Sequence, residues 1–166
     1  MNTIAAIAVA LGKALEPAFG DYGRQVLANA QQLAARLLGE GLALVTGGTD
    51  NHMMVVDTVT SLGIDGKLAE EVLDRIGITT NKQIIPDDPR PPLRPSGIRL
   101  GTPAATTRGM KEAEMETIGR LISRALKGVE QEPELQAVRR EVGRLCERFP
   151  LYAARLQAYD RALAHA

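Results

Sequence analysis

A cluster of prolines between residues 86 and 95 limits the folds open to this chain more than any other feature. Proline fixes its own backbone φ and has no amide hydrogen, so neither a helix nor a central strand passes through such a cluster. The segment is therefore predicted to be a stiff loop between two structured parts. Its five prolines are Pro86, Pro89, Pro91, Pro92 and Pro95.

Before this loop, residues 3 to 38 are predicted to be helical, as one long helix or as two abutting helices. Apolar residues recur there at a spacing of three to four, which is typical of a helix with one buried face. Pro17 interrupts the pattern and indicates a kink. Gly39 and Gly41 are expected to end the helix. The apolar positions are Leu27, Ala30, Leu33, Ala34, Leu37 and Leu38.

Two short apolar strands are predicted next, over residues 42–46 and 53–57. The glycine-containing turn between them favours a β-hairpin. An amphipathic helix is expected over 65–76, because its apolar residues follow the helical period. A short strand is expected over 78–81.

After the proline loop, a strand is predicted over 96–101 and a turn-rich stretch over 102–109. Two helices are predicted over 111–126 and 134–148, and a further helix over 151–166. This order predicts an α+β fold with a small, mainly antiparallel sheet that helices cover on one side. We expect a long helix over 1–40, an α+β domain over 41–152 and a helical tail over 153–166.

Composition and charge argue against some classes of function. Twenty basic and 20 acidic residues give a net charge of zero, and aromatic residues make up 3%. Without a basic stripe or stacking aromatics, nucleic-acid binding is disfavoured. We find no signal peptide and no membrane span, and Cys146 is the only cysteine, so no internal disulfide is possible. A cytoplasmic protein is expected.

The densest polar cluster is the segment from Gly47 to His52. A string of this kind is more often a hairpin turn whose side chains cap their own backbone than a ligand site. Asp50 and His52 alternate along a strand, so they are expected to share a face. With no third ligand at a recognisable spacing, no metal site is predicted.

Arg99 is the only charged residue between Gly97 and Gly101. Its planar guanidinium matches a carboxylate in bidentate fashion, as a lysine would not. An internal salt bridge to an Asp or Glu of the chain is an equally good explanation of an arginine at this position.

Lys82 is the lysine to test as a covalent catalyst, because a Schiff-base lysine needs a lowered pKa. Asp87 and Asp88 follow closely and are expected to keep it protonated, so Lys82 is interpreted as structural or solvated. The other lysines fall on helix faces or caps. No catalytic residue is predicted in this chain.

Several strings, in order and spacing, resemble those of the serine hydroxymethyltransferases. The most specific is Ser-Gly-Ile-Arg-Leu-Gly-Thr-Pro-Ala over residues 96–104. Others are Val-Thr-Gly-Gly-Thr-Asp-Asn-His over 45–52 and Gly-Ile-Thr-Thr-Asn-Lys over 77–82. Matches at 86–92, 107–109 and 145–152 extend the resemblance over nearly the whole chain.

This resemblance implies the small C-terminal domain of an enzyme with the aspartate-aminotransferase-like fold. Such enzymes interconvert serine and glycine, with pyridoxal phosphate as cofactor and tetrahydrofolate as one-carbon carrier, and they form dimers or tetramers. The resemblance makes Arg99 the residue that binds the substrate carboxylate. It implies that the cofactor lysine lies outside these residues, in a large domain. That large domain, the rest of the same polypeptide, would be the partner of this chain. The chain alone is therefore expected to be inactive.

Two departures from the family pattern concern folate. Gln83 stands where the family usually has Asn, and it is the candidate folate contact because it offers the same amide one methylene further out. Pro91 stands where a Ser is common. A paralogue that acts on another β-hydroxy amino acid is therefore an alternative.

A stand-alone interaction module derived from this domain is a second alternative, and an unrelated domain with accidental strings is a third. The chain starts where a long interdomain helix would begin, which favours a cut domain over a separate gene. Residues 3 to 15 are expected to drive self-association if they are left bare.

Overall fold

The computed structural model describes residues 1–152, 156–157, 159 and 161, and the helical N-terminus in it is two helices. They are α1 (Asn2–Ala14) and α2 (Pro17–Gly39), and the chain bends by 80° between them. Pro17 is the first residue of α2, where its missing amide hydrogen breaks no helical hydrogen bond. Gly41 follows α2 with a φ of 83°, a conformation that favours glycine.

Four antiparallel strands form one open sheet in the order β1-β2-β4-β3. They are β1 (Ala43–Leu44), β2 (Met53–Asp57), β3 (Asn81–Gln83) and β4 (Gly97–Gly101). The predicted hairpin is thus confirmed by the β1–β2 pair. The two long strands lie in the middle of the sheet, and the segment with five prolines connects β3 to β4.

In the part of the chain that the structure describes, helices cover one face of this sheet and leave the other face open. The covered face presents the buried side chains of β2 and β4, and the core extends from it through α2, α4 (Gly66–Arg75), α6 (Glu112–Lys127) and α7 (Glu132–Arg148). This confirms the predicted fold class. The buried sheet residues are Leu44, Met54, Val56, Ile98 and Leu100.

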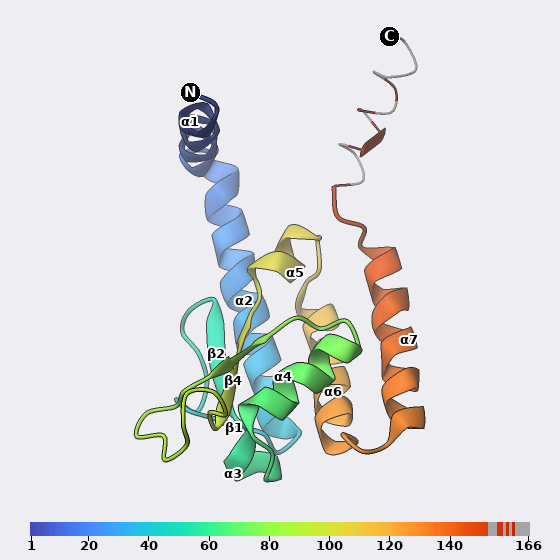
Figure 1. Ribbon diagram of the computed structural model, residues 1–166. Coiled ribbons are helices and arrows are strands. Elements are labelled where there is room, and N and C mark those ends of the chain that lie inside the picture. Colours follow the sequence, from blue (N-terminus) through green and yellow to red (C-terminus); the bar gives the residue numbers. More distant parts are fainter. Residues whose placement is uncertain (153–155, 158, 160, 162–166) are drawn as a thin grey trace.

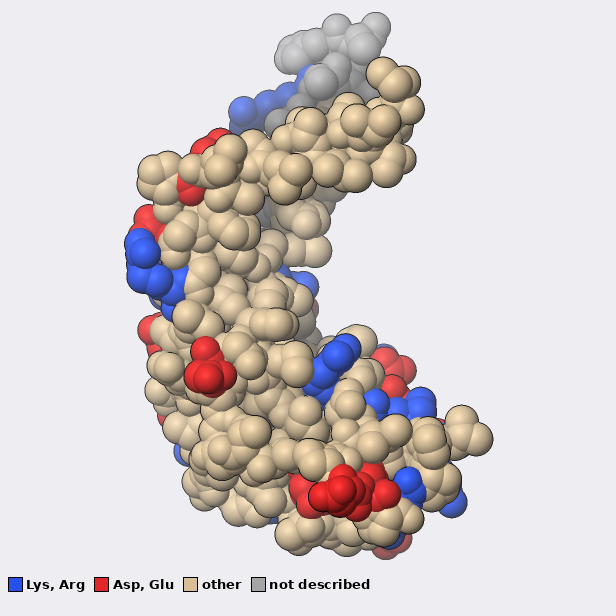
Figure 2. Space-filling view, turned by 90° about the vertical axis from the view of Figure 1, so that its left-hand side faces the viewer, with Lys and Arg blue, Asp and Glu red and all other residues tan. Residues whose placement is uncertain are grey.

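Helix α1 stands clear of this body (Figure 1). None of its residues is buried, and Ile4, Ile7 and Leu11 are 66%, 54% and 63% exposed. Lys13 is its only charged residue, and Figure 2 shows the arm that α1 forms as mostly uncharged. Among the described residues, no helix by itself is long and apolar enough to cross a membrane, and only the bent pair α1 and α2 passes that test together.

The structure corrects two local predictions. The short strand expected over 78–81 is β3 at 81–83, because its pairing with β4 sets its position. The stretch expected to be turns over 102–109 contains a short helix, α5 (Pro103–Thr107). A further short helix, α3 (Thr58–Leu62), follows β2 in a segment for which no prediction was made. Most of the helix predicted over 151–166 lies outside the described residues.

Candidate functional site

Arg99 lies in the middle of β4 with its side chain on the open face of the sheet. It pairs in register with Val55 of β2 on one side and with Asn81 of β3 on the other. The only hydrogen bond of its side chain in the described part of the chain runs from Nε to Asn81 Oδ1, at 3.1 Å, and no carboxylate there forms an ion pair with the guanidinium. The described residues thus do not supply the internal salt bridge that the sequence left open.

Arg99 lines a cavity of about 400 Å³. The hydroxyl of Thr80, another lining residue, is buried without a hydrogen-bond partner among the described residues. A guanidinium, an amide, hydroxyls and an imidazole suit a small, polar, anionic ligand. The lining residues are His52, Met53, Thr79, Thr80, Asn81, Arg99, Leu100 and Gly101.

Helix α4 anchors the strand that carries Asn81. Glu70 accepts hydrogen bonds from the backbone amide of Lys82 at 3.1 Å and from its Nζ at 3.0 Å. Burial raises the pKa of the Glu70 carboxyl, but the hydrogen bonds from Lys82 outweigh it and bring that pKa below its ordinary value. Lys82 is therefore structural, as interpreted, although its partner is Glu70 and neither Asp87 nor Asp88.

Asp88 instead closes the proline loop onto the start of β4. Its carboxylate accepts hydrogen bonds from the amide and hydroxyl of Ser96, at 2.9 and 2.7 Å, and from the amides of Arg90 and Ile85. Burial acts to raise the pKa of this carboxyl, but these bonds prevail and lower it to about 2. The carboxylate of Asp88 thus holds the loop at Ser96, three residues before Arg99.

Gly66 lets α4 approach β4 at van der Waals contact. The amide of Gly66 donates to Pro95 O at 2.7 Å, and a Cβ on Gly66 would lie 2.0 Å from the carbonyl oxygen of Gly97. Gly97 is confined on another side, by the neighbouring strand, since its own Cβ would lie 2.8 Å from Val56 O of β2. This close approach fixes β4 against the helix that also anchors β3.

Helix α2 holds the far end of β4. The Thr102 hydroxyl donates to Val26 O at 2.9 Å, and the fully buried amide of Asn29 donates to Thr106 Oγ1 at 2.8 Å and to Met110 O at 2.9 Å. Arg99 is therefore supported on both sides along its strand. The role of Asn29 was not predicted, because an Asn in a helical pattern is ordinarily solvent-exposed.

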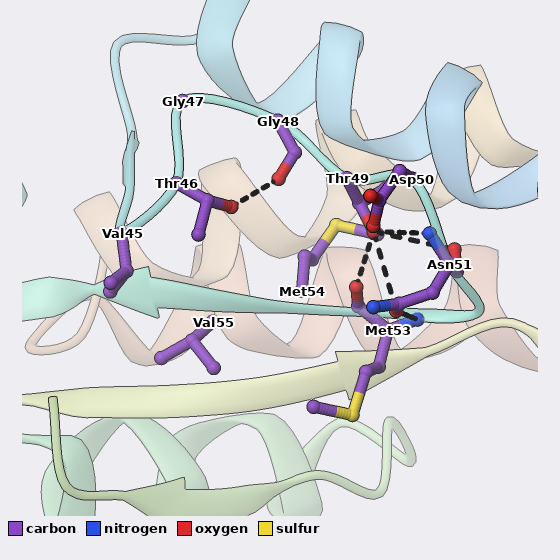
Figure 3. A pocket seen from close by; sticks show the side chains of 10 residues that line it. All are labelled: Val45, Thr46, Gly47, Gly48, Thr49, Asp50, Asn51, Met53, Met54 and Val55. Atoms are coloured by element: carbon purple, nitrogen blue, oxygen red, sulfur yellow. Dashed lines mark hydrogen bonds between the residues drawn. The ribbon is translucent and has the colours of Figure 1, made fainter.

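The cluster from Gly47 to His52 forms a loop over β2 and uses its own polar groups. Thr46 donates to Gly48 O at 2.6 Å, and Thr49 donates to Met53 O at 2.6 Å (Figure 3). This confirms the predicted self-capping turn. The loop encloses a separate hollow of about 420 Å³ that Asp50 lines, whereas His52 lines the cavity at Arg99. The two side chains thus do not share a face, because β2 begins only at Met53.

The remaining candidates lie elsewhere. Gln83 ends β3, two residues beyond Asn81, and its Nε2 donates to Ile84 O at 3.1 Å; it does not line the cavity at Arg99. Cys146 is half-buried against the core. No lysine lines the cavity. Among the described residues, no cluster of three His, Cys, Asp or Glu side chains could hold a metal.

Comparisons with known proteins agree with the resemblance seen in the strings. The family model described as serine hydroxymethyltransferase matches residues 1–122. The serine hydroxymethyltransferase of Myxococcus xanthus (strain DK1622) is 52% identical over 157 residues. That match covers 95% of this chain and 37% of the relative, so the chain spans well under half of the relative's length.

Proposed function

Because the chain belongs to the serine hydroxymethyltransferase family, we propose that the protein carrying it interconverts serine and glycine with tetrahydrofolate as one-carbon carrier. In this proposal the chain is the small C-terminal domain, and the remainder of the same polypeptide is its partner. The chain supplies the end of the active site that binds the carboxylate of the amino acid.

The position of Arg99 carries this proposal. Its guanidinium stands on the open face of the sheet, beside a polar cavity and without a carboxylate partner in the described residues. An unpaired guanidinium at a cavity wall is suited to bind an amino-acid carboxylate through two parallel hydrogen bonds. Binding at this point would fix one end of the substrate.

The residues of this chain do not fit the cofactor's anchoring site. Pyridoxal phosphate, when bound, supplies the electron sink for amino-acid chemistry and is held through a lysine. None of the five lysines lines the cavity, and Lys82 is paired with Glu70. We therefore place the cofactor lysine outside the chain and expect the isolated chain to be inactive.

Gln83 supports the folate part of the proposal more weakly. Its amide lies at the end of an edge strand, on the same face as Asn81, because residues two apart on a strand point to the same side. A paralogue that acts on another β-hydroxy amino acid would use the same Arg99. A cytoplasmic location and assembly as a homodimer are part of the same proposal and follow from the family.

One observation favours a second candidate, a stand-alone interaction module. Helix α1 carries an exposed apolar surface with a single charge, as expected of a segment that another protein surface covers. The same surface is expected if the rest of the polypeptide covers it, so the size of the native protein distinguishes the two candidates.

The test is to isolate the native protein from its source cells with an antibody raised against this chain. A polypeptide much heavier than 17.8 kDa that converts serine to glycine in the presence of tetrahydrofolate supports the proposal. A polypeptide of 17.8 kDa without activity supports the interaction module. Borohydride reduction of the isolated chain with pyridoxal phosphate should label no single lysine, and a specific adduct would contradict the placement of the cofactor.

The role of Arg99 is tested by Arg99→Lys in the native polypeptide. The loss of a bidentate, charge-assisted pair of hydrogen bonds should raise KM for serine by roughly ten- to a hundredfold. Arg140→Lys on α7, an exposed position outside the cavity, is the matched control and should leave KM unchanged. An unchanged KM for Arg99→Lys would refute the carboxylate role.

A further inference from the structure

We propose that Asn81 is a positioning residue that sets which edge of the Arg99 guanidinium receives the substrate carboxylate. This inference rests on the proposed role of Arg99. The two residues are direct cross-strand neighbours in the register of β3 and β4, so their side chains lie on the same open face. The bond from Arg99 Nε to Asn81 Oδ1 measures 3.1 Å.

The amide of Asn81 has one orientation because both of its ends are engaged. Nδ2 donates to the backbone carbonyl of Lys82 at 3.0 Å, which turns Oδ1 toward Arg99. Lys82 is itself held to α4 by two bonds to Glu70. A connected series of hydrogen bonds thus runs from α4 to the guanidinium.

This arrangement leaves only one edge of the guanidinium free to bind a carboxylate with two bonds. A guanidinium offers either the edge formed by Nε and one Nη or the end formed by Nη1 and Nη2. Asn81 occupies Nε, so the carboxylate meets Nη1 and Nη2 end-on. The same bond restrains the long arginine side chain before the substrate arrives, which reduces the entropy lost on binding.

The first test is made on the ¹⁵N-labelled chain without any ligand. The Nε–H signal that disappears in Arg99→Lys identifies Arg99, and the exposed Arg140 serves as the internal reference. Exchange of the Arg99 Nε–H with water should be about tenfold slower than that of Arg140, because one hydrogen bond protects it. Asn81→Ala should abolish this protection, and Asn81→Asp, which keeps an acceptor, should retain it. Equal exchange rates in the chain and in Asn81→Ala would overturn the proposal.

The second test measures serine kinetics in the native polypeptide. Asn81→Ala should raise KM several-fold and leave kcat nearly unchanged, since the guanidinium remains but is no longer oriented. If Arg99→Lys raises KM and Asn81→Ala does not, the positioning role is wrong and the proposed function stands. If neither variant changes KM, the carboxylate role of Arg99 itself has failed. Gln136→Ala, which removes an exposed amide on α7, is the control for loss of an amide elsewhere.

Discussion

Helix α4 and strand β4 approach each other most closely at Gly66. An added methyl group there should therefore lower the free energy of unfolding more than at the other glycines. An added Cβ would lie 2.0 Å from Gly97 O and 2.8 Å from Gly97 C, and both atoms belong to the backbone. Carbon and oxygen atoms in proteins do not approach closer than about 3 Å, so α4 and β4 must separate by about 1 Å. That shift would stretch the 2.7 Å bond from Gly66 N to Pro95 O beyond hydrogen-bond range.

The expected loss follows from these two effects. Overpacking against backbone costs about 1–3 kcal/mol, and the hydrogen bond contributes about 1 kcal/mol. Gly66→Ala should therefore lower the free energy of unfolding by about 2–4 kcal/mol, measured by urea denaturation with far-ultraviolet circular dichroism. The dichroism signal is the suitable probe because the chain has no tryptophan.

Gly143→Ala is the matched control. Gly143 lies exposed within α7, and nothing would meet its Cβ within 4 Å. Alanine there should raise the free energy of unfolding by about 0.5–1 kcal/mol, because glycine is a poor helix former. If Gly66→Ala were as stable as the unsubstituted chain, the reasoning from the close approach would be refuted.

Two further predictions concern the proline loop and α1. The pKa of Asp88 lies below its ordinary value of 3.8, so its bonds stabilise the fold above that pH, and the contribution is lost as the pH falls toward about 2. The stability difference between the chain and Asp88→Asn, measured in urea, should shrink over that range; a difference independent of pH would count against the loop's role. Replacing Ile7 and Leu11 together by Gln should abolish concentration-dependent sedimentation of the chain, whereas Lys13→Gln should not. Sedimentation of the double variant identical to that of the unsubstituted chain would exclude α1 as the contact.

Strands and helices were predicted correctly where the apolar residues of a segment follow a clear strand or helix period. Residues 53–57 became β2, and 65–76 became α4 with Asp65 as its cap, because alternation and helical spacing were clear there. The strand expected over 78–81 was misplaced because pairing with β4 decides which residues are extended. The helix α5 was missed because its stabilising bonds come from distant residues of α2.

At the candidate site, too, local sequence predicted one residue, and the tertiary structure decided which residues lie beside it. Arg99 stood out in the sequence as a single charge between apolar residues, and its chemistry suggested a carboxylate. Its partner Asn81 lies 18 positions away, and only the order of strands in the sheet brings the two together. The pairing of Lys82 with Glu70, where Asp87 and Asp88 were expected, likewise depends on how α4 packs beside β3.

The order of strands also has a consequence for aggregation. The shortest strands, β1 with two residues and β3 with three, occupy the two edges, and the five-residue strands lie inside. Short edges offer few free backbone groups to the sheet of another molecule, which protects against growth into cross-β fibrils. Copies of this chain are therefore expected to associate in solution through contacts between their α1 helices. Their sheets are expected not to pair with one another.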